Sequence, residues 1–309
     1  MSSVLREMRV ETRVGAVRVH LRAAGRPAMR RGRGAAVTQQ QPGGTVPEDV
    51  TSRIDTGVAH PARVYDYWLG GKDNFAADRE AAEQVIAVRP RITADVRANR
   101  AFLGRAVRYL AAEAGIRQFL DIGTGLPSAD NTHEVAQGVA PDSRVVYADN
   151  DPIVLAHARA LLTSTPEGVT DYVDADLRET SQVLAQAART LDLSQPAAVM
   201  LIAVLHHIPD ADDPYGIVAQ LTAAMAPGSY LVLSHPAADI DTEAVAEVAR
   251  RYNARVPAGQ QRRSREEVAR FFDGLELLEP GIVQTTQWRP PVLGSTTPVP
   301  MWAGVGRKP

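Results

Sequence analysis

The chain has 309 residues, 45% of them apolar, and a formal net charge of −2 at pH 7. This near-balance of charge excludes the strong positive field typical of nucleic-acid binders, and the absence of cysteine excludes disulfides, thiolate catalysis and cysteine metal sites. The sequence has no apolar run of the roughly 18 residues that a membrane-spanning helix needs, and no apolar secretory core at its N-terminus, so we expect a cytoplasmic protein.

Residues 1–48 differ in composition from the rest of the chain. Arginines far outnumber acidic residues there, and residues 39–45 form a polar linker. Because so few apolar residues cannot build a core, we predict a disordered basic tail, or a translation start at a later methionine such as Met29. A nucleic-acid arm and an organelle-targeting peptide are the functional alternatives.

Helical patterns come next, over residues 60–69, 73–88 and 93–114. The first ends at two glycines, which is a helix-stop signal, and the third has apolar residues at helical spacing. Because these segments precede the first strand, we expect residues 49–115 to form a helical cap across the open end of an α/β core over residues 116–309.

From residue 118 onward strands and helices alternate, which predicts a mostly parallel sheet. We expect strands at 118–122, 144–148, 169–173, 197–203 and 229–234, with helices at 130–138, 152–163, 179–190 and 213–226. Two further strands, 275–284 and 299–305, would form a terminal hairpin through the turn at Arg289-Pro-Pro291. A hairpin after five α/β units is the arrangement of class I methyltransferases, whereas a nicotinamide-binding Rossmann domain more often ends on another crossover helix.

The most informative motif is the glycine turn after the first strand, Asp121-Ile-Gly-Thr-Gly125. Gly123 and Gly125 have no Cβ, so the backbone on either side of Thr124 can approach a ligand closely. The carboxylate of Asp121 would repel a pyrophosphate and attract an ammonium group, which S-adenosylmethionine carries and NAD does not. The dinucleotide pattern also needs a third glycine where Ser128 stands. The motif therefore favours methyl transfer; a tight turn without a ligand is the structural alternative.

Acidic residues also follow the next two strands. Asp149, with Asn150 beside it, stands about 24 residues after Gly125, the distance at which an acid reaches the ribose hydroxyls of an adenosine ligand. Asp176 can accept a hydrogen bond from the adenine amine while Leu177 packs against the ring; a solvated loop is the alternative. Because the carboxyl ends of parallel strands line one crevice, the acids together indicate adenosyl recognition.

The fourth expected strand leads into His206 and His207. A histidine at this place would face the donor methyl group and act as a general base near neutral pH, and shaping the pocket floor is the alternative role. His235, after the fifth strand, is a further pocket candidate. No glutamate or histidine stands at helical ligand spacing from the pair, so we expect no metal site.

Four segments resemble the actinobacterial S-adenosylmethionine-dependent methyltransferases once catalogued as a domain of unknown function, DUF574. They are residues 63–79, 99–102, 119–127 and 175–178, of which the first is the longest and most specific. The resemblance spans about residues 50–309 and leaves the basic tail outside. It implies a class I, Rossmann-like methyltransferase domain over residues 49–309 with S-adenosylmethionine at the glycine turn, and it names no methyl acceptor.

The first two segments also suggest roles within the cap. The resemblance implies that Gly70, Gly71 and Asn74 close over the methionine end of the cofactor. Arg100 offers a fork of donors for the methionine carboxylate; a plain surface position is its alternative. For Trp68 we favour packing in the core over contact with a ligand.

The leading hypothesis is a methyltransferase that acts on an oxygen or nitrogen of a small molecule. We expect no nucleic-acid or membrane partner, and the sequence does not indicate an oligomeric state. A nicotinamide-dependent oxidoreductase is the alternative, weakened by Asp121, Ser128 and the terminal hairpin. A non-catalytic adenosyl-binding regulator whose tail touches DNA is the third possibility. The arginines of residues 236–274 offer contacts for an acidic substrate, although charged helical faces are usually solvated.

Overall fold

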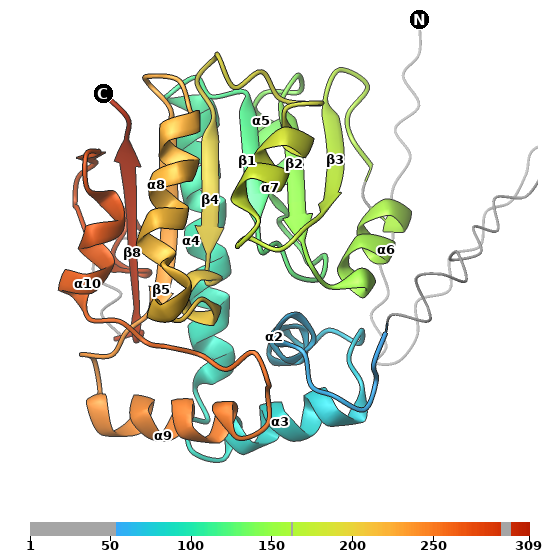
Figure 1. The fold of residues 1–309 in the computed structure, drawn as a ribbon, viewed down its shortest axis with the longest axis vertical. Coiled ribbons are helices and arrows are strands. Elements are labelled where there is room, and N and C mark those ends of the chain that lie inside the picture. Colours follow the sequence, from blue (N-terminus) through green and yellow to red (C-terminus); the bar gives the residue numbers. More distant parts are fainter. Residues whose placement is uncertain (1–53, 162, 292–297) are drawn as a thin grey trace, which may run out of the picture. The chain divides into compact units, whose positions relative to one another are not determined.

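The computed structural model describes residues 54–309 except residue 162 and residues 292–297. The expected basic tail of residues 1–48 therefore lies outside the described residues. Within them, no helix is long and apolar enough to cross a membrane. Strands and helices alternate along most of the chain, and the strands form one sheet with helices on both faces (Figure 1).

Among the described residues the sheet has eight strands, of which five are parallel, in the order β3-β2-β1-β4-β5-β8-β6, with β7 also paired to β8. The parallel strands are β1 Gln118–Ile122, β2 Arg144–Asp149, β3 Val169–Asp174, β4 Ala198–Ile202 and β5 Tyr230–Pro236. They confirm the expected mostly parallel sheet. The strand order reverses between β1 and β4, the position at which ligands bind in open α/β sheets.

The terminal strands are antiparallel to their neighbours, as expected, but the first of them is broken. β8 (Met301–Arg307) pairs with β5, and the expected strand over 275–284 is two short strands, β6 (Glu276–Leu277) and β7 (Val283–Gln284). Pro280 and Gly281 separate them. Proline has no N–H to donate to the ladder, and Gly281 adopts a positive φ of 80°, so the chain turns there.

Helices cover both faces of the sheet. α4 (Ile92–Ala112) and α5 (Thr132–Val139) pack on one face, and α7 (Thr180–Ala187) and α8 (Pro214–Ala224) pack on the other. The apolar residues of β1 alternate between these layers: Phe119 contacts the first, whereas Leu120 and Ile122 contact the second. Burial on both faces explains why the strands read as nearly continuous apolar runs.

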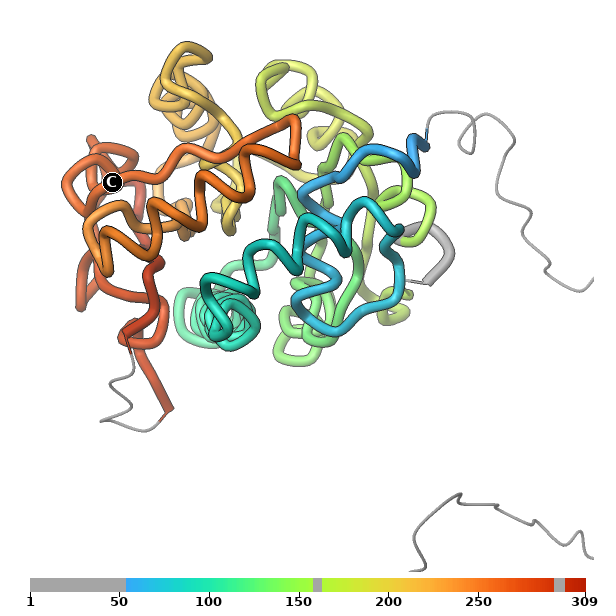
Figure 2. Tube along the Cα trace, turned by 90° about the horizontal axis from the view of Figure 1, so that it is seen from below, coloured from blue at the N-terminus to red at the C-terminus, as the bar shows by residue number. Residues whose placement is uncertain are grey.

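Further helices lie at the carboxyl ends of the parallel strands. They are α2 (Pro61–Leu69), α3 (Ala76–Ile86) and α9 (Thr242–Asn253). α3 and α9 lie side by side although they are far apart in sequence (Figure 2), and they share a core cluster with Trp68 of α2. α4, which the sequence pattern places with the cap, instead packs its second half on the sheet.

The remaining elements are short or lie at the edge of the sheet. They are α6 (Pro152–Leu161), α10 (Arg265–Ala269) and the 3-10 turns η1 (Leu205–His207), η2 (Asp210–Asp212) and η3 (Arg270–Phe272). α10 and η3 extend the layer formed by α7 and α8. η1 directly follows β4 and thereby carries both candidate histidines to the carboxyl end of the sheet.

Candidate functional site

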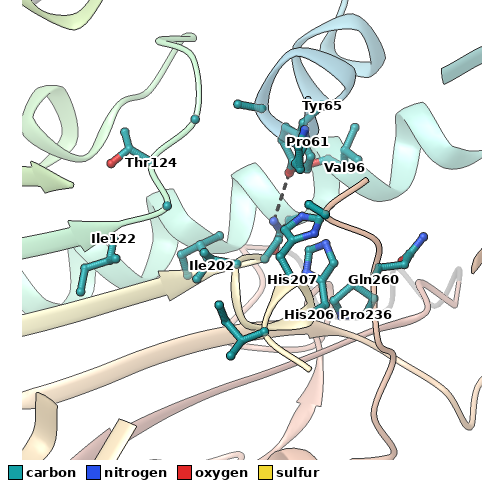
Figure 3. Close-up of a pocket in the computed structure, with 18 of the residues that line it drawn as sticks. Pro61, Tyr65, Val96, Ile122, Thr124, Ile202, His206, His207, Pro236 and Gln260 are labelled. Carbon is teal, nitrogen blue, oxygen red and sulfur yellow. Dashed lines mark hydrogen bonds between the residues drawn. The ribbon is translucent and has the colours of Figure 1, made fainter. Parts of the chain in front are cut away.

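A cavity of about 220 Å³ opens at the carboxyl ends of β1, β2 and β4. Its walls come from the glycine turn, from α2, α4 and α9, and from residues 258–262 and 300–301. In Figure 3, Ile122 and Thr124 lie at one end of the cavity, and His207 and Gln260 lie at the other. The cavity therefore joins the expected ligand turn to the region of the candidate histidines.

The two glycines of the turn serve different purposes, although both have positive φ, 71° for Gly123 and 67° for Gly125. A Cβ on Gly123 would stand 2.3 Å from Cγ2 of Val204, so close packing of the protein itself requires this glycine. A Cβ on Gly125 would meet no atom within 4 Å and would enter open space. Gly125 is thus the position where the backbone leaves room for a ligand.

Asp121 is buried at the end of β1 and lines the cavity. The hydroxyl of Thr132 donates a hydrogen bond of 2.5 Å to its Oδ2. Burial raises the pKa of Asp121 to about 6, against the opposing effects of the Thr132 hydrogen bond and the charge of Arg100, whereas the charge of Asp149 raises it further. Near neutral pH the carboxylate is largely ionised and positioned to attract a cation.

Asp149 is held rigidly at the end of β2. The amide of Gly125 donates to its Oδ2 at 2.9 Å, and the amide of Asp151 donates to its Oδ1 at 2.9 Å. Burial raises the pKa of Asp149, and these two amide bonds lower it. The carboxylate therefore ties the ends of two strands together and still has lone pairs for a ligand in the cavity that it lines.

Asp176 and Leu177 also line the cavity, next to Asn150. The side chain of Asn150 donates to Oδ2 of Asp176 at 3.1 Å, and the amide of Arg178 donates to Oδ1 at 2.9 Å. Leu177 is buried in the core cluster beneath. The carboxylate of Asp176 and the side chain of Leu177 therefore lie together, as the binding of an adenine base would require.

Arg100 lines the cavity and is close enough to Asp121 for its charge to lower the pKa of that carboxyl. Its Nη2 donates to the carbonyls of Ala129 at 3.3 Å and Asp130 at 3.2 Å. Its Nε is buried and has no hydrogen-bond partner among the described residues. Arg100 therefore lies half-buried in the wall of the cavity.

Gly70, Gly71 and Asn74 lie outside the lining of the cavity. Gly70 has a φ of 87° and ends α2, and a Cβ on Gly71 would stand 1.9 Å from Oδ1 of Asp66. The Asn74 side chain donates to the other carboxylate oxygen of Asp66 at 2.8 Å. In the described structure these three residues shape the turn that follows α2.

The two histidines of η1 line the cavity and contact each other, with ring centroids 3.9 Å apart. Burial lowers the pKa of His206 well below its ordinary value and that of His207 to about 4, so both rings are neutral near pH 7. His207 Nδ1 lies 2.6 Å from the carbonyl of Gly259, which assigns the proton to Nδ1 and leaves Nε2 as an acceptor. Nδ1 of His206 is buried without a partner among the described residues.

His235, the further pocket candidate, is fully buried and lies outside the cavity lining. Its Nδ1 is 2.9 Å from the carbonyl of Pro236, and its Nε2 accepts from Arg263 at 2.9 Å. Both ring nitrogens are therefore used within the protein. Across residues 54–161, 163–291 and 298–309, no group of three His, Cys, Asp or Glu side chains is arranged to hold a metal ion.

Asn99 is a cavity residue to which the sequence analysis gave no role. Its side chain donates to the hydroxyl of Tyr65 at 3.1 Å and accepts from the hydroxyl of Ser234 at 2.7 Å, and Tyr65 donates to the carbonyl of Val96. This series of hydrogen bonds joins α2, α4 and β5 across the cavity. The resembling segment 99–102 was the only sequence signal for it, because asparagine and serine at these positions carry no pattern of their own.

Comparisons with known proteins agree with the geometry. A family model described as S-adenosyl methyltransferase matches residues 47–309. The crystal structure of a DUF574 family protein from Streptomyces avermitilis has a TM-score of 0.80 at 48% identity, over 83% of this chain and 100% of that one. The crystal structure of a provisionally named methyltransferase from Thermobifida fusca has a TM-score of 0.76 at 41% identity, over 85% of this chain and 98% of that one. A search of curated proteins found no match. None of these findings supports the oxidoreductase or the regulator.

Proposed function

Because the chain belongs to the S-adenosyl methyltransferases and is an enzyme whose cofactor is S-adenosylmethionine, we propose that it methylates an oxygen or nitrogen of a small molecule bound next to the cofactor. The observation that carries this proposal is the extent of the cavity, which continues from the glycine turn to α9 and residues 258–262. We call that far part the acceptor side; Trp68, Ile92, Val248, Tyr252, His207 and Arg262 line it.

The residues of the glycine-turn side fit the cofactor. Gly125 leaves open space where a Cβ would stand, and the buried Nε of Arg100 has no described partner. In our proposal Asp121 attracts the methionine ammonium group and Arg100 binds the methionine carboxylate. Asp149 accepts from the ribose hydroxyls, with Asn150 beside it.

The adenine ring would pack against Leu177, and the carboxylate of Asp176 would accept a hydrogen bond from its exocyclic amine. S-adenosylmethionine supplies a methyl group on a positively charged sulfur. Gly123, Thr124 and Gly125 shape the backbone around it. The chain's own contribution is to hold the donor and the acceptor in one cavity, so that much of the rate comes from alignment.

His206 and His207 are our candidates for the proton acceptor. Both rings are neutral near pH 7, and each has a ring nitrogen without a described hydrogen-bond partner, Nδ1 in His206 and Nε2 in His207. Such a nitrogen can take the proton that a hydroxyl acceptor loses on methylation, or the proton that a neutral amine acceptor releases after its lone pair has bonded to the methyl group.

Calorimetric titration with S-adenosylmethionine, S-adenosylhomocysteine and NAD tests the cofactor site. We expect micromolar binding of the two adenosyl ligands and none of NAD. Incubation of the protein and S-adenosylmethionine with a small-metabolite extract should then yield a product heavier by one methylene group, detected by mass spectrometry. A product found only on added polypeptide or nucleic acid would contradict the small-molecule proposal.

We expect cofactor affinity to rise with pH between pH 5 and pH 7. Because burial raises the pKa of Asp121 to about 6, roughly one carboxyl group in ten is ionised at pH 5, and a protonated Asp121 does not attract the ammonium group. The affinity for S-adenosylhomocysteine should therefore be about tenfold weaker at pH 5 than at pH 7.

Titration of Asp121→Asn at the two pH values is the control. This variant should bind weakly at both and lose most of the pH dependence. Any dependence that remains belongs to other groups, including Asp149, whose pKa burial also raises. An unchanged tenfold difference in Asp121→Asn would show that Asp121 is not the titrating group.

Alanine at the two turn glycines should give opposite results. Gly123→Ala combines a positive φ with a contact 2.3 Å from Val204 and should lower the free energy of unfolding by about 2–5 kcal/mol. Gly125→Ala meets no protein atom, so it should lose only about 1 kcal/mol of stability while binding S-adenosylhomocysteine at least about tenfold more weakly. Urea unfolding and calorimetry measure the two quantities; equal effects at both positions would contradict the assigned roles.

A further inference from the structure

The segment of residues 236–274 holds a group of arginines that look alike in sequence but differ in their contacts. Five of them have partners within the protein: Arg250 and Arg251 bind Glu247, Arg255 binds Glu80, Arg263 binds Asp210, and Arg265 donates to the carbonyl of Ile282. None of these five lines the cavity. A sixth, Arg270, lies over the ring of Tyr215 at 4.0 Å and is also outside the lining. The seventh, Arg262, lines the cavity.

Arg262 is half-buried and has very few hydrogen bonds. Its one described hydrogen bond runs from Nη1 to the carbonyl of Ala237 at 3.4 Å, and its Nε is buried without a partner. Within the part of the chain that the structure describes, no carboxylate forms an ion pair with it. A guanidinium has five N–H donors, so most of its hydrogen-bonding capacity remains for a ligand.

The two acids near Arg262 pair with Arg89, although Oδ1 of Asp95 is buried without a partner among the described residues. Arg89 donates to Asp95 at 2.5 Å and to Asp241 at 3.1 Å. Burial and the charge of Arg89 lower the pKa of Arg262 to about 10, while Asp95 opposes this change, so Arg262 stays a cation near neutral pH. A half-buried cation without a paired anion loses part of its hydration, and a ligand that brings the anion offsets that cost.

Apolar and aromatic side chains line the acceptor side together with Arg262. Trp68 and Tyr252 contact each other with ring centroids 6.2 Å apart, and Ile92 and Val248 belong to the same core cluster. This wall suits a flat or apolar body, whereas Arg262 suits a planar anion that accepts two parallel hydrogen bonds.

We propose that the methyl acceptor is an apolar carboxylic acid and that Arg262 binds its carboxylate on the acceptor side of the cavity. The inference rests on the proposed function, because it assigns the acceptor to this cavity. It identifies the substrate class: a ring or chain that packs against Trp68 and Tyr252, carrying one carboxylate.

The test uses benzoate and cinnamate as probes, each paired with its neutral amide. Their binding to protein saturated with S-adenosylhomocysteine is measured by calorimetry for the wild type, Arg262→Met and Arg255→Met. Arg255 is the matched control, because it lies in the same segment, carries the same charge and is outside the cavity lining. In the wild type and in Arg255→Met at least one acid should bind about tenfold more tightly than its amide, and in Arg262→Met this preference should disappear.

Equal binding of every acid and its amide, or no binding of either acid to the wild type, would overturn the proposal. A second measurement separates a ligand role from a structural one: the melting temperature of Arg262→Met should be no lower than that of the wild type, and a large fall would mean that Arg262 supports the fold instead. S-adenosylhomocysteine must still bind Arg262→Met. Its failure to bind the wild type would refute the proposed function itself.

Discussion

Replacing Asp149 by alanine should reduce the affinity for S-adenosylmethionine by about a hundredfold or more. In our proposal its carboxylate accepts from the ribose hydroxyls, and hydrogen bonds to a charged group are each worth about 1.5–3 kcal/mol. The same carboxylate also holds the amide of Gly125 at 2.9 Å, so the variant loosens the glycine turn as well. Calorimetric titration of the purified variant measures the loss.

Two further variants make this result interpretable. Asp142→Ala removes an exposed aspartate that pairs with Arg117 at the surface, and it should bind the cofactor like the wild type. Asp149→Asn keeps the size of the side chain and one acceptor oxygen, and its affinity should lie between the wild type and Asp149→Ala. If Asp149→Ala is folded and its affinity is within threefold of the wild type, Asp149 is not the ribose ligand.

Replacing Arg263 by methionine should lower the free energy of unfolding by about 2–4 kcal/mol. Its side chain is 1% exposed and donates to the carbonyls of Leu205 and Ile208 at 3.1 and 2.9 Å, to Oδ1 of Asp210 at 2.7 Å and to Nε2 of His235 at 2.9 Å. The methionine removes all four bonds and leaves buried acceptors without donors, each at a cost of about 1–3 kcal/mol. Removal of the buried charge offsets part of this loss.

Urea unfolding of the wild type, Arg263→Met and Arg255→Met measures the effect. Arg255 forms a surface ion pair with Glu80, so its variant should lose at most about 1 kcal/mol. Because Arg263 holds the two carbonyls that flank His206 and His207, we also expect lower methyltransferase activity in Arg263→Met. If Arg263→Met loses less unfolding free energy than Arg255→Met, the structural role of Arg263 is contradicted.

The layered fold could be predicted from the sequence because local patterns and tertiary burial agree there. β1 was expected at residues 118–122 and lies at Gln118–Ile122, and the other parallel strands shift by no more than two residues at either end. Strands buried on both faces are continuously apolar and are flanked by turn residues. The acids at the ends of β1 and β2 followed from the same rule, because parallel strands end at one edge.

The sequence pattern did not predict that the strand over residues 275–284 is broken, because such a pattern says nothing about the neighbouring strand with which it pairs. Pro280 and Gly281 interrupt the pairing with β8, and only two short pieces remain. The motif residues Gly70, Gly71 and Asn74 show a related difficulty. They contact Asp66 in the turn after α2, a contact that no spacing in the sequence indicated.

The sequence by itself determined the class of the sheet, the glycine turn and the acids Asp121 and Asp149 beside it, because backbone geometry and strand direction impose these locally. Only the tertiary structure decided which side chains meet across the cavity. Arg262 and Arg263 are adjacent and chemically identical, yet one lines the cavity with a single long hydrogen bond and the other is buried with four shorter ones. The difference comes from the surroundings that other parts of the chain supply: η1, η2 and β5 bring partners to Arg263, and α2, α4 and α9 enclose the space beside Arg262.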